Sequence, residues 1–317
     1  MARPSTSSST SSRQSSAQVP NASHNETNRR RSGEISEKDD SSEHRHDHAE
    51  IQSPFTSKLY PYDASLLPEG KRSLSHIGAQ AFWLGFALAA SLILGTQAAY
   101  FEYRIWRLFA FTASLSLFHF LEFWTTATYN LPQVRASSFL LFSNGIAYNT
   151  AHGAALMEIL ISTWFSSYQA RFVNVFTIAV GLTMVVFGQL MRSTAMATAG
   201  TNFNHTPQRV KQQGHELVTS GIYSFSRHPS YMAFFWWAIG TQILVGNKIC
   251  LVAFIVSLWT FFNNRIRGEL LSACEVLVFC GATYADLDLA EERSLVEFFG
   301  KDYDAYRKST MTGIPFI

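Results

Sequence analysis

The feature that most constrains this chain is a succession of long apolar stretches, separated by short polar breaks, that begins near residue 76. A helix that crosses the hydrocarbon core of a bilayer needs about 20 mostly apolar residues, and these stretches meet or approach that length. The last two are short and are separated only by Gly246-Asn247-Lys248, which predicts a tight helical hairpin within the membrane. We therefore predict an all-α integral membrane protein with about six transmembrane helices. The expected spans are 77–100, 105–126, 139–164, 172–191, 231–245 and 249–262.

Residues 1–72 differ sharply from the rest and are dominated by Ser, Asn, His, Arg and Glu. They offer too little apolar surface to offset the entropy of ordering, and they lack the continuous apolar segment of a secretory signal peptide. We expect a disordered, non-catalytic polar tail followed by a membrane domain at 76–317. The run His44-Arg45-His46-Asp47-His48 contains metal-binding side chains, but a solvated tail is the favoured interpretation.

Charge and cysteine usage argue against two other kinds of partner. The formal net charge is +2, which gives no case for a nucleic-acid partner. Cys250, Cys274 and Cys280 form no Cys-x-x-Cys or Cys/His zinc pattern. We expect neither a metal site nor a disulfide framework.

Several predicted spans carry ionisable side chains, each of which costs about 3 kcal/mol at the bilayer centre unless it is paired or faces a cavity. His119 and Glu122 are three residues apart and share a helix face. For this pair, and for His152 and Glu158, we favour inter-helix hydrogen bonding over a direct role in the chemistry. Arg192 ends a span beside the segment richest in reactive side chains, so it is a candidate catalytic residue.

Residues 200–231, between two predicted spans, concentrate glycine, histidine, tyrosine and arginine. Gly221 suits a tight turn, and Pro229 suits the first turn of the following helix. A turn and a helix cap would explain these two residues. They do not explain Arg227, His228 and Tyr231 together, so this segment is the candidate functional site.

The segment resembles a known family. The pattern His-x-Leu-Val-Thr-x-Gly-x-Tyr from His215, followed by Arg-His-Pro-Ser-Tyr from Arg227, is similar to the signature of the isoprenylcysteine carboxyl methyltransferases. Arg-His-Pro-x-Tyr alone is less specific. The similarity extends over most of 76–317, as quoted in Phe118-His119-x-x-Glu122, Ser138-Phe139-Leu140-Leu141, Gly240-Thr241-Gln242, Phe261-Phe262 with Arg265, Glu291-Glu292, Phe298-Phe299-Gly300 with Tyr303 and Tyr306, and the ending Gly313-Ile314-Pro315-Phe316-Ile317.

The resemblance implies methylation of the C-terminal carboxylate of a prenylated cysteine, in proteins processed at a C-a-a-X end, with S-adenosylmethionine as methyl donor. It implies a multi-pass protein of the endoplasmic reticulum membrane. Arg265 corresponds to the family's substrate-contacting arginine, and Arg192 to a functionally important basic residue. The implied cofactor-binding residues are Gln208, His215, Glu216, Leu217, Val218, Tyr223, His228, Pro229, Ser230, Tyr231 and Glu291. Loop charges are too sparse to orient the chain, so we place the cofactor-binding segment in the cytosol because a soluble donor must reach it.

Three alternatives remain: a phospholipid amine methyltransferase, a sterol reductase and a non-catalytic membrane scaffold. The first shares the Arg-His-Pro motif but should lack the Thr-Gly-Ile-Pro-Phe-Ile ending. The second needs a nicotinamide nucleotide, and the third needs no donor. No Gly-x-Gly-x-x-Gly follows a predicted strand, so the soluble dinucleotide-type fold is not expected.

Residues 268–290 interrupt the resemblance as an atypical insertion. All four charges in this block are acidic, and it holds a strand-like run at 276–279. Without 22 of these residues, Glu291 would follow Arg265 by four positions on one helix face. A retained intron and a looped-out insertion are the two explanations.

Overall fold

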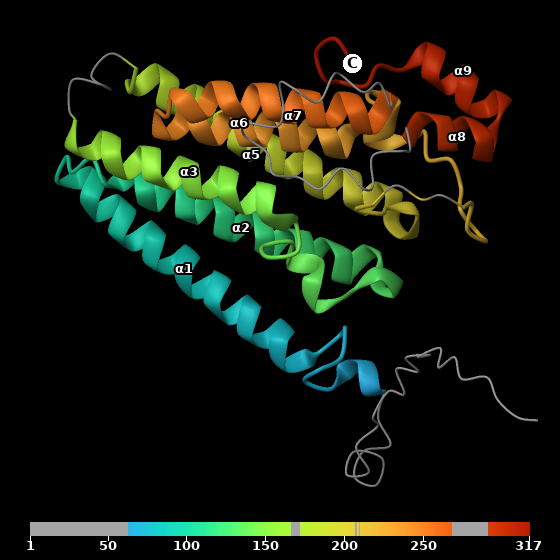
Figure 1. Cartoon of the computed structure of the whole chain (residues 1–317), viewed down its shortest axis with the longest axis horizontal. Helices are drawn as coiled ribbons and strands as arrows, with labels where there is room; N and C mark the ends of the chain where they lie inside the picture. Colours follow the sequence, from blue (N-terminus) through green and yellow to red (C-terminus); the bar gives the residue numbers. More distant parts are fainter. Residues whose placement is uncertain (1–62, 166–171, 207, 209, 268–290) are drawn as a thin grey trace, which may run out of the picture. The chain divides into compact units, whose positions relative to one another are not determined.

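The structure is a computed structural model that describes residues 63–165, 172–206, 208, 210–267 and 291–317. These residues belong to one compact unit, Tyr60–Ile317. The long helices lie side by side, and successive ones run in alternating directions (Figure 1). They are α1 (Leu74–Tyr100), α2 (Trp106–Tyr129), α3 (Gly145–Trp164), α5 (Val175–Ala199), α6 (Pro229–Val245) and α7 (Ile249–Arg267), followed by the short helices α8 (Glu291–Phe299) and α9 (Lys301–Ser309).

The expectation of a helical membrane protein is confirmed, but the expected number of six spans is not. Among the described residues, four helical segments are long and apolar enough to cross a membrane: Leu74–Tyr100, Trp106–Tyr129, Val175–Asn202 and Ile249–Arg267. α3 and α6 also lie where spans are predicted, with 20 and 17 residues. The number of spans therefore stays a prediction.

The helix expected from residue 139 begins only at Gly145. Ala136–Phe139 forms a 3₁₀ turn, and Leu140 then takes a left-handed conformation with φ 61°. The buried Phe139 ring stacks on Phe123 at 4.2 Å, and its carbonyl accepts a hydrogen bond from His119 Nδ1 at 2.8 Å. Apolar residues here fill a buried turn, which a hydropathy pattern cannot distinguish from a helix start.

The packing of α5 against α6 depends on glycines. A Cβ on Gly188 would lie 2.7 Å from Cβ of Trp237, and one on Gly240 would lie 2.7 Å from Cβ of Met184. A Cβ on Gly181 would overlap the backbone of Leu244. Such small residues let two helix backbones approach closely in a membrane. This contact fixes the first turn of α6, which enters the functional site.

The α6–α7 hairpin is closed by polar groups. Gly246 ends α6 with φ 72°, a conformation that a side chain would strain. Glu158 of α3 accepts hydrogen bonds from the backbone N–H groups of Lys248, Ile249 and Cys250 at 2.6, 3.0 and 2.7 Å. A carboxylate at this place satisfies N–H groups that the first turn of α7 leaves unpaired.

Residues 63–72, the end of the predicted tail, form hydrogen-bonded turns. Asp63 caps a 3₁₀ turn by accepting from the Ser65 N–H at 2.9 Å, and the Lys71 carbonyl accepts from the Ala136 N–H at 2.9 Å. The expected disordered tail is 1–72, and its residues 1–62, with the histidines at 44–48, lie outside the described residues, as does the insertion at 268–290.

Candidate functional site

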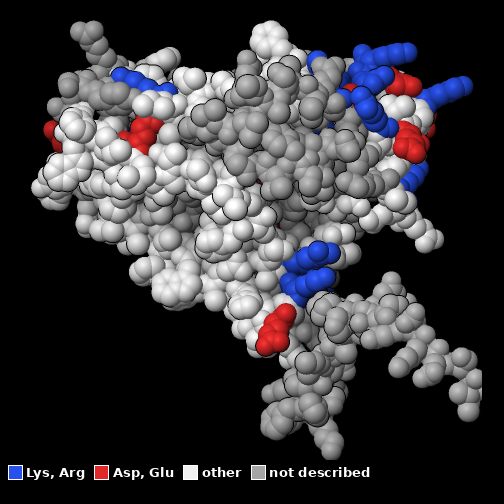
Figure 2. Space-filling view, viewed as in Figure 1, with Lys and Arg blue, Asp and Glu red and all other residues white. Residues whose placement is uncertain are grey.

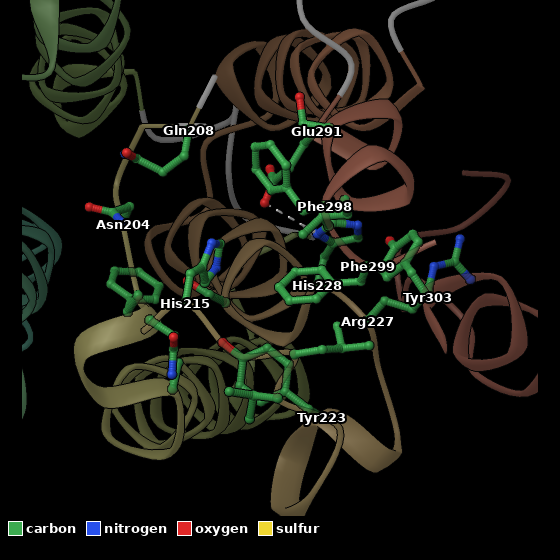
Figure 3. Close-up of a pocket in the computed structure, with 18 of the residues that line it drawn as sticks. Asn204, Gln208, His215, Tyr223, Arg227, His228, Glu291, Phe298, Phe299 and Tyr303 are labelled. Atoms are coloured by element: carbon green, nitrogen blue, oxygen red, sulfur yellow. Dashed lines mark ion pairs between the residues drawn. The ribbon is translucent and has the colours of Figure 1, made fainter. Parts of the chain in front are cut away.

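A cavity opens at the end of the helices where α5 finishes and α6 begins. Its walls come from the last residue of α5, the segment 202–218, the first turn of α6 and the faces of α8 and α9. Figure 3 shows side chains from these separate segments around one space. The lining residues run from Ala199 to Tyr306, so the cavity joins parts of the chain that are about 100 residues apart in the sequence.

All the residues that the sequence nominated for the cofactor line this cavity. They are Gln208, His215, Glu216, Leu217, Val218, Tyr223, His228, Pro229, Ser230, Tyr231 and Glu291. Arg192 and Arg265 are not among its lining residues, but each contacts a residue that is.

The start of α6 positions the histidine and the tyrosine of the central motif. Pro229 occupies the first turn, where its missing N–H costs nothing, and His228 stands at the cap. Since His228 and Tyr231 are three residues apart, their rings stack at 5.6 Å with an interplanar angle of 5°. The Tyr231 hydroxyl donates to Glu291 Oε2 at 2.7 Å, and His228 Nδ1 lies 3.9 Å from Glu291 Oε1.

Arg265 contacts Tyr231 without lining the cavity itself. Its Nε donates to the Tyr231 hydroxyl at 2.9 Å, its Nη2 donates to the His205 carbonyl, and its guanidinium lies 5.3 Å from the Tyr231 ring centroid. Nη1 has no hydrogen-bond partner among the residues that the structure describes. Arg265, Tyr231 and Glu291 thus form one chain of contacts, which ends in the cavity wall.

Glu292 contacts two residues that line the cavity, Arg227 and His228. Its Oε1 accepts from Arg227 Nε at 2.8 Å and lies 3.5 Å from His228 Nε2. Burial alone would raise the pKa of Glu292, but the contacts with His228 and Arg227 lower that pKa to about 2. Arg227 also donates to the carbonyls of Arg307 and Thr310, so it ties the motif to α9 and the C-terminal segment.

Arg192 is held by a carboxylate within the helices. Its Nε and Nη2 donate to the two oxygens of Glu122 at 2.8 and 3.0 Å, and its Nη1 donates to Ser230 Oγ at 2.5 Å. His205 Nδ1 lies 3.8 Å from the same carboxylate. Burial lowers the pKa of His205 to about 4, so this imidazole is neutral near pH 7. In this arrangement Arg192 supports the cavity wall through Ser230.

The histidines of α2 and α3 both contact Tyr148 of α3, His119 from the neighbouring helix and His152 from within the same helix. His119 Nε2 lies 3.0 Å from the Tyr148 hydroxyl, and His152 Nδ1 lies 2.9 Å from the Tyr148 carbonyl. Glu158 caps α7, as described above. The geometry thus matches the inter-helix hydrogen bonding favoured from the sequence for His119, Glu122 and Glu158, whereas the hydrogen bond of His152 lies within α3.

A further set of lining residues was not nominated for the cofactor from the sequence. Among them Tyr303 and Tyr306 are buried, and burial raises the pKa of each, to about 12 for Tyr306. The others are Ala199, Asn202, Phe203, Asn204, Thr206, Arg227, Ser294, Leu295, Phe298 and Phe299. For four of these residues the sequence did contain a signal, because Phe298-Phe299 and the pair Tyr303 and Tyr306 belong to the patterns that resemble the family.

In the part of the chain that the structure describes, no cluster of three or more His, Cys, Asp or Glu side chains is placed to hold a metal ion. The expectation that no metal takes part stays a prediction.

Comparisons with known proteins give one consistent result. Residues 179–272 match the model of the isoprenylcysteine carboxyl methyltransferase family. The chain is 37% identical over 255 residues to the protein-S-isoprenylcysteine O-methyltransferase of Saccharomyces cerevisiae, covering 79% of this chain and 95% of that protein. It is 36% identical over 243 residues to the human protein of the same name, covering 76% and 75%. Among solved structures it matches a eukaryotic intramembrane Ras methyltransferase with a TM-score of 0.63 and 33% identity, over 75% of each chain.

Proposed function

The chain belongs to the isoprenylcysteine carboxyl methyltransferase family, and on that premise we propose that its cavity holds S-adenosylmethionine for methylation of a prenylated cysteine's C-terminal carboxylate. The observation that carries the assignment of the site is the convergence of all eleven nominated cofactor residues on one cavity. These residues come from five separate stretches of sequence, so their meeting is a property of the fold.

The lining suits a donor that combines a purine, a ribose, an amino acid and a positive sulfur. Aromatic side chains from α8 and α9 provide flat apolar faces, and Glu216 and Glu291 provide negative charge. The Tyr303 hydroxyl is buried without a hydrogen-bond partner among the described residues, although it lines the cavity. A buried hydroxyl in that state is a candidate donor or acceptor for a bound molecule.

Methyl transfer to a carboxylate does not require the protein to take up or release a proton. The donor supplies a methyl group on a positively charged sulfur, and the acceptor carboxyl is ionised at neutral pH because its ordinary pKa is near ~3.5. No general base is required. The side chains must instead align the reactants and exclude water, and alignment alone can lower a barrier by roughly 7–11 kcal/mol.

Arg265 is the residue we propose for the acceptor carboxylate. Its Nε and Nη2 are occupied by Tyr231 and the His205 carbonyl, which hold the guanidinium plane in place. The Nη1 N–H groups remain to bind one carboxylate oxygen while the other oxygen attacks. Because Tyr231 and Ser230 line the cavity, Arg265 and Arg192 act one contact away from the donor.

The membrane setting follows from the lipid half of the substrate. A prenyl chain gains about 0.8 kcal/mol per buried methylene in apolar surroundings, so the substrate arrives from the bilayer. We assign six spans, with α3 and α6 completing the set of helices, and place the cavity and both termini on the cytosolic side of the endoplasmic reticulum membrane. Residues 1–72 are then a non-catalytic extension of the membrane domain 76–317.

Two variants separate the donor side from the acceptor side. His228→Ala should weaken S-adenosylmethionine binding to purified protein, because it removes a ring that lines the cavity and stacks on Tyr231. Arg265→Lys keeps the charge but loses the planar fork, so activity should fall while donor affinity changes little. Wild-type donor affinity in His228→Ala would refute the donor assignment. Equal loss of donor binding in both variants would refute the division between the two sides.

A further inference from the structure

A second groove lies beside the cavity, where three helices end. It is lined by Arg267 at the end of α7, by Glu292, Arg293 and Val296 of α8, and by Arg307 of α9. Figure 2 shows lysine and arginine side chains gathered over this corner of the visible face. The proposed methyl transfer makes no use of Arg267 or Arg293.

The groove carries excess positive charge. Glu292 is the one carboxylate among its lining residues, and Arg227 Nη2 already lies 2.7 Å from it. Arg307 lies 3.9 Å from Glu292 and 3.2 Å from Asp304. Within the described ranges, Arg267 and Arg293 are exposed and form no ion pair. Counting only acidic partners from the described residues, two unpaired guanidiniums therefore face one groove.

The length of α7 sets the level of this groove in a membrane. Its 19 residues span about 28 Å at 1.5 Å per residue, close to the roughly 30 Å thickness of a hydrocarbon core. Val252 and Val256 are 61% and 57% exposed on its outer face, as expected for lipid contact. Arg267 is the last residue of α7, so it lies at the headgroup layer, on the same side as the cavity.

We propose that this groove binds the phosphate of an anionic phospholipid headgroup. Guanidinium groups match phosphate oxygens with paired N–H donors, and Arg267 and Arg293 approach from two different helices. The proposal rests on α7 crossing the bilayer and not on the identity of the methyl acceptor. Glu292 belongs to this groove and also contacts Arg227 and His228 of the cavity, so an occupied groove adjoins the donor site.

The test measures lipid binding by the purified full-length chain in neutral detergent. The probes are dioctanoyl phosphatidylserine, dioctanoyl phosphatidylcholine and inorganic phosphate, and the readout is the dissociation constant of each. We expect phosphatidylserine to bind more tightly than the other two. Arg267→Gln and Arg293→Gln should each weaken it about fivefold, the contribution of one basic residue near a membrane surface.

Matched controls are Lys301→Gln and Lys308→Gln, which remove exposed α9 cations that do not line the groove. They should leave the phosphatidylserine constant unchanged. Arg293→Lys keeps the charge and should bind at an intermediate level, which separates lost recognition from lost folding. Equal losses in control and groove variants would overturn the proposal in favour of diffuse attraction. Equally tight inorganic phosphate would overturn it in favour of a free-anion site. Equal binding of both lipids would overturn it as well.

Discussion

The pair formed by Glu122 and Arg192 joins the helix bundle to the cavity wall, and Glu122→Gln tests its importance. Both side chains are buried, with 1% and 9% exposed, and two N–H···O bonds of 2.8 and 3.0 Å connect them. Removing one partner of a buried ion pair costs about 3–5 kcal/mol because the other charge is left uncompensated. We expect a loss of unfolding free energy of this size, together with weaker donor binding, since Arg192 also holds Ser230.

The assay is chemical denaturation of the purified protein in detergent, followed by tryptophan fluorescence. Glu102→Gln is the matched control, because it makes the same change at an exposed glutamate and should stay within about 0.5 kcal/mol of wild type. The double variant Glu122→Gln/Arg192→Gln should be less damaged than the sum of the two single variants. A Glu122→Gln protein within about 1 kcal/mol of wild type would refute the argument that this pair anchors the wall.

The remaining predictions address packing, pH and chain boundaries. Gly188→Ala should cost about 1–3 kcal/mol through overpacking against Trp237, whereas Gly78→Ala, which meets nothing within 4 Å, should not; denaturation checks both. Glu292 has its pKa lowered from 4.5 to about 2, so its stabilisation is complete above pH 4.5 and is lost as pH falls through 2. The melting temperature of wild type should therefore fall more over this window than that of Glu292→Gln. A chain that begins at Asp63 should retain methyltransferase activity in membranes, and complete inactivity of a stable, inserted form would contradict the assignment of the tail. Deletion of residues 269–290 should leave donor binding at least as strong as in the full chain; loss of binding would show that Glu291 is wrongly placed in the cofactor site.

The helices were predictable from the sequence because apolar length alone identifies a membrane-spanning segment. Their ends were less predictable. The span expected to stop at Met191 continues as α5 to Ala199, since Arg192 finds Glu122, which is 70 residues away. A polar residue that looks like a helix end is here paired inside the bundle, and only the fold reveals its partner.

The cofactor wall was predictable where its residues lie in one dense motif, from His215 to Tyr231. The aromatic residues of α8 and α9 were not, because nothing local indicates that Phe298 and Tyr303 face His228. The support of Arg265 by the His205 carbonyl was equally hidden, since a backbone acceptor leaves no mark in the sequence. The groove with Arg267 and Arg293 could not be predicted either, because it forms only where the fold brings α7, α8 and α9 together.

The central claim is that this chain transfers a methyl group to a prenylcysteine carboxylate. Membranes containing the chain should convert N-acetyl-S-farnesylcysteine to its methyl ester when given S-adenosylmethionine labelled in the methyl group. The label should be released by base, as expected for an ester, and Arg265→Lys should lower the rate. Phosphatidylethanolamine offered in the same membranes should stay unlabelled. Label in the phospholipid with none in the farnesylcysteine, from correctly folded protein, would contradict the account.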